Sequence, residues 1–209
     1  MILASLLACA SGLAVDERLV SWDENREALT AAYLEKHCGD CSTTNKPTVI
    51  VLHGTGAASM DALHARFDAA ELPADRRDLA WAGTVNVSTH FGVDRDGTIT
   101  RFLADHRVGR HTVGLNHTSI GIENLGDGPE HDLTEAQVVA NAALVRILAK
   151  EHPIAWLVGH HEAQAMACAD VFRELDPDYS TFARDPGDSF VLAVEKQVAN
   201  LGLKRATCP

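Results

Sequence analysis

The sequence has no apolar run long enough to cross a membrane, no internal repeat and no excess of basic residues. It contains 18 lysines and arginines against 29 aspartates and glutamates, a formal net charge of −11. Because nucleic-acid-binding domains usually carry a basic face, this charge argues against a nucleic-acid partner. It also argues against adhesion to an anionic membrane surface by charge alone. Without a linker or a low-complexity tract, 209 residues indicate one domain with a sizeable core.

The apolar N-terminus, MILASLLACASG, is too short to span a membrane and lacks the basic region of a signal peptide. Its residues Leu6-Leu7-Ala8-Cys9 are similar to a bacterial lipoprotein cleavage box, with Cys9 as the lipidated residue. A chance cysteine in a frayed terminus is the alternative. We therefore expect a separate segment at 1–20, a domain at 21–205, and membrane contact only through a lipid anchor at Cys9.

Four further cysteines, Cys38, Cys41, Cys168 and Cys208, suggest disulfides, which could pair in three ways. The Cys38-Gly-Asp-Cys41 motif could instead be half of a zinc ribbon, but Cys168 and Cys208 are too far apart to form the second half. A redox motif is a further alternative, although no thioredoxin-like strand precedes it. We expect the structural disulfides Cys38–Cys41 and Cys168–Cys208.

Helical and strand patterns alternate along the chain, which predicts a single α/β domain with a mixed central sheet flanked by helices. Helices are expected at 23–37, from Ser59 to about residue 70, from Thr134 to the residue before Pro153, and from Pro186 towards residue 203. Strands are expected in VIVLH, HTSIGIENLG and AWLVGHH, with a hairpin that turns at Asp96-Gly97.

Two strands of the buried type, VIVLH and AWLVGH, each end in a histidine, His53 and His160. The stretch WLVGHHEAQ does not complete the H-E-x-x-H motif of zinc proteases, because no second histidine follows His161 at the required spacing. A catalytic zinc site needs three protein ligands and one open position. The third ligand must then come from a loop at the same sheet edge, and Asp185, in the turn DPG, is a candidate.

Six segments resemble, in order, the zinc-dependent N-acetylmuramoyl-L-alanine amidases of the type 2 family, whose fold is related to phage lysozyme-type amidases and peptidoglycan recognition proteins. They are VIVLHGT, NVSTHFGVDRDGTITRF, RHTVGLNHTSIGIENLG, LTEAQ, VGHHE and DPG, and the resemblance is strongest over residues 48–190. It implies one zinc ion per chain, held by His53, His160 and Asp185. It also implies that Glu123, in SIGIEN, is the acid–base residue beside the metal.

The sequence departs from the family where a lysine commonly stands two positions before the aspartate ligand. Ala183 occupies that position, and Arg184 follows it. Arg184 is the candidate catalytic residue that would stabilise the oxyanion in place of this lysine, although adjacent residues usually point in different directions. The alternative is an Arg184 that faces solvent and pairs with a surface carboxylate such as Asp188.

Four further residues in the resembling segments are candidates for the substrate cleft: His90, His111, Asn116 and His161. Each has a simpler interpretation. His90 and His111 could be core residues, Asn116 could serve a turn, and His161 could lie behind the ligand His160.

The resemblance implies hydrolysis of the amide bond between the lactyl group of N-acetylmuramic acid and L-alanine, in peptidoglycan or muropeptides. It implies a place in the bacterial cell envelope, as a periplasmic protein or an outer-membrane lipoprotein, or outside the cell. A catalytically weak or inactive peptidoglycan-binding module is the first alternative, which the missing lysine favours and the complete ligand set with Glu123 opposes. A zinc hydrolase acting on another amide is the second.

Overall fold

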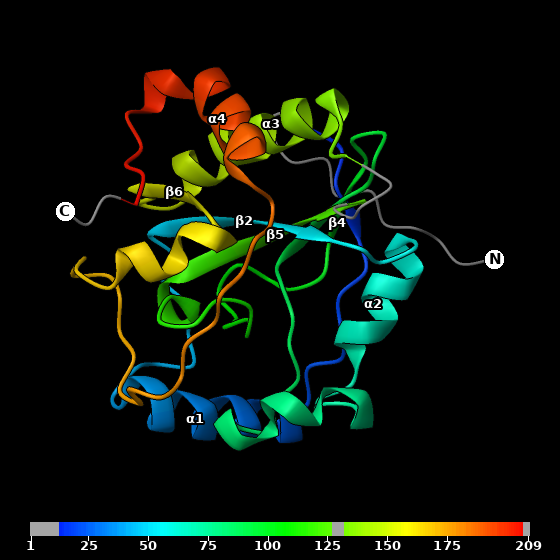
Figure 1. The fold of residues 1–209 in the computed structure, drawn as a ribbon. Helices are drawn as coiled ribbons and strands as arrows, with labels where there is room; N and C mark the ends of the chain where they lie inside the picture. Colours follow the sequence, from blue (N-terminus) through cyan, green and yellow to red (C-terminus); the bar gives the residue numbers. More distant parts are fainter. Residues whose placement is uncertain (1–12, 127–131, 207–209) are drawn as a thin grey trace.

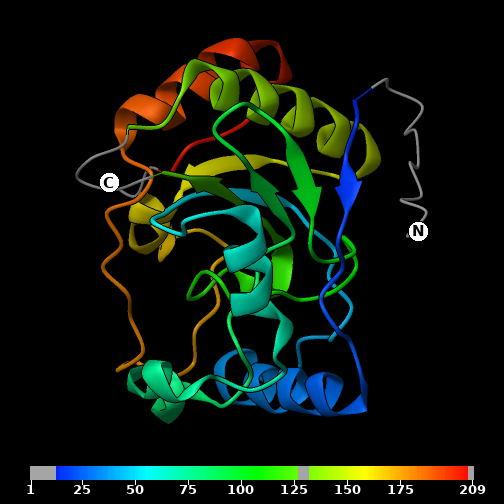
Figure 2. The ribbon, with the colours of Figure 1, turned by 90° about the vertical axis from the view of Figure 1, so that its right-hand side faces the viewer.

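The computed structural model describes residues 13–126 and 132–206, and its centre is a six-stranded mixed sheet (Figures 1 and 2). The strands are β1 (Asp16–Glu17), β2 (Val49–Thr55), β3 (Phe91–Val93), β4 (Ile99–Arg101), β5 (Ser119–Leu125) and β6 (Trp156–Gly159), in the order β1-β4-β3-β5-β2-β6. β2 pairs in parallel with both β5 and β6, whereas β3 and β4 form the antiparallel hairpin. The predicted α/β class, the mixed sheet and the hairpin are confirmed.

Helices cover both faces of this sheet (Figure 1). The α-helices are α1 (Glu24–Cys38), α2 (Met60–Asp68), α3 (Glu135–Glu151) and α4 (Asp188–Gln197). Short 3₁₀ segments are η1 (Ala74–Ala82), η2 (Asn116–Thr118), η3 (His160–Met166) and η4 (Ala199–Leu201). α3 and α4 lie over one face, and α1 with η1 lies beneath the other, with α2 at its side (Figures 1 and 2).

Three predicted helix starts are confirmed by their caps. The side chains of Asp23, Ser59 and Thr134 each accept a hydrogen bond from a backbone N–H of the first turn. The prediction for the last helix was wrong in its bounds. Gly187, with φ 82°, is the N-cap residue, so that α4 begins at Asp188 and not at Pro186; the helix ends at Gln197.

The central strand β2 supplies alternate residues to two separate cores. Ile50 and Leu52 pack against the face covered by α3 and α4, whereas Val49 and Val51 pack on the opposite face with Val158. Side chains alternate between the two faces of a strand. His53 therefore continues the face of Val49 and Val51, away from α3 and α4.

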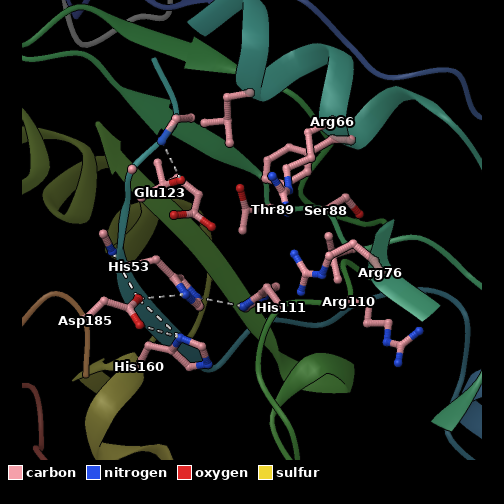
Figure 3. A pocket seen from close by; sticks show the side chains of 17 residues that line it. His53, Arg66, Arg76, Ser88, Thr89, Arg110, His111, Glu123, His160 and Asp185 are labelled. Atoms are coloured by element: carbon pink, nitrogen blue, oxygen red, sulfur yellow. Dashed lines mark hydrogen bonds and ion pairs between the residues drawn. The ribbon is translucent and has the colours of Figure 1, made fainter. Parts of the chain in front are cut away.

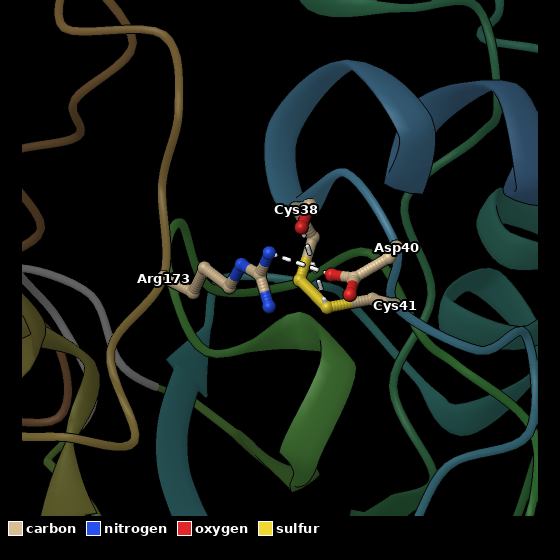
Figure 4. The surroundings of a disulfide bond; sticks show 4 residues. All are labelled: Cys38, Asp40, Cys41 and Arg173. Carbon is tan, nitrogen blue, oxygen red and sulfur yellow. Dashed lines mark hydrogen bonds and ion pairs between the residues drawn. A yellow bond between two sulfur atoms is a disulfide. The ribbon is translucent and has the colours of Figure 1, made fainter.

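A disulfide joins Cys38 and Cys41 at the C-terminal end of α1, as predicted (Figure 4). Between them Gly39 takes φ 75°, a left-handed conformation that favours glycine, and Asp40 pairs with Arg173 at 2.6 Å. Cys168 is itself disulfide-bonded. Its predicted partner, Cys208, lies outside the described residues, as does Cys9, so that both expectations stay predictions.

Within residues 13–126 and 132–206, no helix has the length and apolar character that a membrane span requires.

The capping box of α3 yields a test of local stability. Thr134 Oγ1 accepts from the backbone N–H of Gln137 at 3.2 Å and donates to the Arg95 carbonyl at 2.7 Å. We expect Thr134→Ala to lower the free energy of unfolding by about 1 kcal/mol, the usual contribution of an N-cap, in urea denaturation. Thr134→Ser keeps the hydroxyl, so it should stay close to the parent; equal losses in both variants would contradict this role.

Candidate metal centre

His53, His160 and Asp185 converge at the C-terminal edge of the sheet (Figure 3). One ligand atom from each lies within 4.8 Å of the other two. Nδ1 of His160 is 3.1 Å from Oδ1 and 3.2 Å from Oδ2 of Asp185, and Nδ1 of His53 is 3.6 Å from Oδ2. The structure thus brings together the three residues that the sequence proposed as ligands, in a group that could hold a metal ion.

Strand pairing and two backbone contacts position this group. His53 is the fifth residue of β2, and His160 directly follows β6, the parallel neighbour of β2. The loop of Asp185 is fixed to both strand ends. The backbone N–H of Gly54 donates to Oδ2 of Asp185 at 3.1 Å, and the backbone N–H of His161 donates to the Asp185 carbonyl at 2.9 Å.

The electrostatics of the group suit a cation. Burial, followed by repulsion from His160, lowers the pKa of His53 to about 4. Burial would raise the pKa of Asp185, but hydrogen bonds with His160 and His53 outweigh it and hold that pKa well below its ordinary value. At neutral pH His53 therefore keeps a free nitrogen lone pair and Asp185 keeps its negative charge, which are the protonation states that a metal requires.

His111 lies directly behind His53. Its Nδ1 is 3.1 Å from Nε2 of His53 and 2.8 Å from Oγ1 of Thr112. The ring occupies the space above Gly121, where an added Cβ would lie only 2.9 Å from it. Burial, together with repulsion from neighbouring histidines, holds the pKa of His111 well below its ordinary value. A neutral His111 can orient the ring of His53 through this contact.

Glu123 stands beside His53 in the sheet, because the register of β5 and β2 pairs these two residues. Ile120 and Ile122 pack with α3 and α4, so the alternation of β5 turns Glu123 to the opposite face, the face of His53. There it lines a cavity of about 460 Å³ together with His53, His160 and Asp185 (Figure 3). The predicted acid–base residue and the predicted ligands thus share one cavity.

Three arginines line the same cavity: Arg66 from α2, Arg76 from η1, and Arg110 (Figure 3). Arg110 is buried, and its guanidinium donates to the carbonyls of Gly83 and Val85 at 2.8 Å each. Arg66 and Arg76 have no carboxylate partner within 4.0 Å among the described residues. The sequence reasoning missed all three, since they come from separate elements with no shared motif.

The other predicted cleft residues lie as follows. His111 lines the cavity, and Asn116 lines an adjoining one of about 110 Å³. Oδ1 of Asn116 accepts from the backbone N–H groups of His111 and Thr112 at 2.8 and 2.7 Å, so that this amide fixes the loop of His111.

The placement of His90 and His161 in the cleft was wrong. His90 is fully buried in the core, where its two nitrogens bond to the backbone of Gly121 and Arg107. His161 turns away from the cavity, because its ring faces the Asp185 carbonyl at 3.1 Å and Asp188 at 3.3 Å.

The structure does not bring Arg184 to the site. Its side chain is exposed, and it is not among the described residues that line either cavity. This agrees with the alternation of side-chain directions between neighbouring residues, because Asp185 takes the inward position. The positive charge in the cavity comes from α2, η1 and Arg110 instead.

Comparisons with known proteins agree with this geometry. The model of a family described as N-acetylmuramoyl-L-alanine amidase matches residues 43–179, which include His53, Glu123 and His160. The endolysin of Klebsiella phage KP32 is 34% identical over 91 residues, which are 41% of this chain and 60% of that protein, so the match spans less than two thirds of the relative.

Two solved structures share the fold. N-acetylmuramoyl-L-alanine amidase LysC from Clostridium intestinale superposes with a TM-score of 0.58 at 23% identity, covering 91% of this chain and 98% of that one. Peptidoglycan recognition protein-LE, solved in complex with tracheal cytotoxin, a monomeric peptidoglycan, has a TM-score of 0.50 at 18% identity. That match covers 79% of this chain and 90% of that one.

The core position of His90 can be tested by its protonation. Nδ1 accepts from the backbone N–H of Gly121 at 3.1 Å, so Nε2 must carry the proton and donate to the Arg107 carbonyl at 2.9 Å. Burial lowers the pKa of His90 to about 4. In ¹H–¹⁵N NMR spectra we expect the Nε2–H tautomer and no titration of this ring between about pH 5 and 8, the range in which an unperturbed histidine titrates. Protonation near pH 6.5 would show that the ring is solvated.

Proposed function

The chain belongs to the N-acetylmuramoyl-L-alanine amidase family, and on this basis we propose that it hydrolyses the amide bond between the lactyl group of N-acetylmuramic acid and L-alanine. The substrate is peptidoglycan or a muropeptide fragment of it. The observation that carries the proposal is the presence of His53, His160, Asp185 and Glu123 in one cavity. The endolysins and the recognition protein bound to a monomeric peptidoglycan support the choice of substrate class.

We propose that the metal is zinc, one ion per chain, with His53, His160 and Asp185 as ligands. The donor set fits, because two imidazoles and one carboxylate are a usual ligand combination of hydrolytic zinc sites, which leave one position open. When bound, zinc in such a set acidifies a water molecule and polarises the carbonyl of the bond to be cleaved. His111 would keep the ring of His53 in its orientation through the contact between their nitrogens.

Glu123 is the proposed acid–base residue. Its carboxylate takes the proton of the attacking water as the C–O bond forms, and it returns that proton to the departing nitrogen as the C–N bond breaks. The strand register places Glu123 beside His53, so its carboxylate lies near the proposed ligands. Glu123 itself is not a proposed ligand.

The arginines of the cavity favour an anionic substrate. Arg66 and Arg76 place positive charge on the wall of the cavity in a chain whose net charge is −11. Peptide stems of peptidoglycan carry carboxylates, which guanidinium groups bind well. We propose accordingly that the protein acts in the cell envelope or outside the cell, where this substrate occurs, and that any lipid anchor is attached at Cys9.

The ligand assignment is tested by metal analysis of His160→Ala. The side chain of His160 is 19% exposed, and that of His152, which bonds to Asp105 outside the cavity, is 23% exposed. We expect His160→Ala to lose stoichiometric zinc because one of three ligands is gone, whereas the matched control His152→Ala should keep it. Full zinc occupancy of the folded His160→Ala protein would refute the assignment.

The role of Glu123 is tested by turnover of a purified muropeptide. We expect Glu123→Gln to lower kcat by about 10²- to 10⁴-fold, the usual contribution of acid–base catalysis, while zinc content stays at that of the parent. Near-normal kcat in this variant would exclude the acid–base role. A parent protein that binds the muropeptide and zinc without turnover would instead identify a peptidoglycan-binding module.

A further inference from the structure

We propose that Arg205 is a positioning residue for the zinc site, acting through ion pairs that hold the loops of His160 and Asp185. Arg205 lies beyond the region 43–179 that the family model matches. The inference rests on the proposed function, because it assumes that these two residues bind zinc.

The C-terminal segment returns to the sheet beside β6 (Figure 1). The backbone N–H of Lys204 donates to the Ala155 carbonyl at 2.9 Å, and the N–H of Leu157 donates to the Lys204 carbonyl at 2.9 Å. These bonds form a parallel bridge between Lys204 and Trp156. They fix the backbone next to Arg205 against the strand that leads to His160.

One branch of contacts leads from Arg205 to His160. The guanidinium of Arg205 donates to Oε1 of Glu162, and Oε2 of Glu162 accepts from the backbone N–H of Gly159 at 2.8 Å. Gly159 directly precedes His160. The side chains of Arg205 and Glu162 are only 18% and 12% exposed, so this ion pair is better shielded from water than a surface pair.

A second branch leads from Arg205 to Asp185. The guanidinium lies 3.2 Å from Oδ1 of Asp188, and the same oxygen is 3.3 Å from Nε2 of His161. The backbone N–H and Nδ1 of His161 both contact the Asp185 carbonyl, at 2.9 and 3.1 Å. A single guanidinium is thus connected to the backbone next to one proposed ligand and to the backbone of another.

Arg205 also keeps three carboxylates together. Besides Glu162 and Asp188 it approaches Oε2 of Glu195 at 3.6 Å. Without the guanidinium, Glu162 and Asp188 would repel each other, which would strain the contacts of Glu162 with Gly159 and of Asp188 with His161. Groups that hydrogen-bond directly to metal ligands typically change metal affinity by about 10- to 100-fold when they are removed. Arg205 acts through one further contact, so its removal should have an effect at the lower end of this range.

The experiment compares the parent protein with Arg205→Gln, Arg205→Lys and the control Arg146→Gln. Arg146 is a half-buried arginine of α3 whose guanidinium donates to the Gln197 carbonyl, outside the metal site. Zinc dissociation constants of the metal-free proteins are measured by competition with a chromophoric chelator, at a temperature where circular dichroism shows each protein to be folded. We expect Arg205→Gln to raise Kd by about 10-fold, Arg205→Lys to recover part of the affinity, and Arg146→Gln to match the parent.

A general loss of stability would lower the melting temperature of Arg205→Gln but leave the Kd of the folded protein unchanged. Equal zinc affinities of the parent and Arg205→Gln would therefore overturn the proposal. If Arg205→Gln does not fold, the zinc affinity of Glu162→Gln is measured in its place. This substitution removes the carboxylate partner of Arg205, while the new amide oxygen can still accept from the backbone N–H of Gly159. Weaker zinc binding by Glu162→Gln supports the proposal, and unchanged binding contradicts it. A parent that binds no zinc would contradict the proposed function itself, whereas a zinc-binding parent with a normal Arg205→Gln variant contradicts the role of Arg205 alone.

Discussion

Backbone hydrogen bonds between β2 and its two parallel neighbours set the positions of the residues on which the site depends. The pair β2–β5 places His53 beside Glu123, and the pair β2–β6 places Leu52 beside Gly159, one residue before His160. A shift of either pairing by one residue would turn these side chains to the face that α3 and α4 cover. Packing on both faces protects the register, because such a shift would exchange Ile50 and Leu52 with Val49 and Val51 between two differently shaped cores, in which all four are completely buried.

Burial of histidine is the second recurring constraint. His53, His90 and His111 are all buried, and burial lowers the pKa of each below its ordinary value. A charged imidazole in such a place would lose its hydration, and this cost outweighs even the nearby carboxylate of Asp185 at His53, so the neutral form is preferred. In the core, His90 uses this form to bond two backbone segments. Next to Asp185 the same neutral form leaves His53 able to act as a metal ligand.

Basic residues outnumber acidic ones in the cavity, whereas acidic residues outnumber basic ones in the chain as a whole. The sequence is strongly acidic, yet three arginines line the cavity next to Asp185 and Glu123. Arg110 serves the fold, because its guanidinium is bonded to the carbonyls of Gly83, Val85 and Leu79. Arg66 and Arg76 have no carboxylate partner in the described part of the chain, so their guanidinium groups remain available to a ligand. Their positive charge on the cavity wall attracts the anionic groups of a ligand.

Local patterns determined much of this protein from the sequence alone. The helix starts at Asp23, Ser59 and Thr134, the continuous apolar run of β2 and the turn at Asp96-Gly97 depend on neighbouring residues only. The grouping of His53, His160, Asp185 and Glu123 at one cavity was also predictable, because strand-end histidines and the ordered motifs of a family identify positions without three-dimensional information.

Tertiary structure decided which other side chains surround these residues. The sequence does not distinguish His90 from His111 as a cleft or core residue, and packing alone places His90 in the core and His111 at the cavity. Arg184 is next to a proposed ligand in the sequence but exposed in space, whereas Arg66, Arg76 and Arg205 reach the site or its supporting loops from distant elements. The physical reason is that a side chain's direction and its long-range partners follow from how strands and helices pack. No short segment of the sequence contains that information.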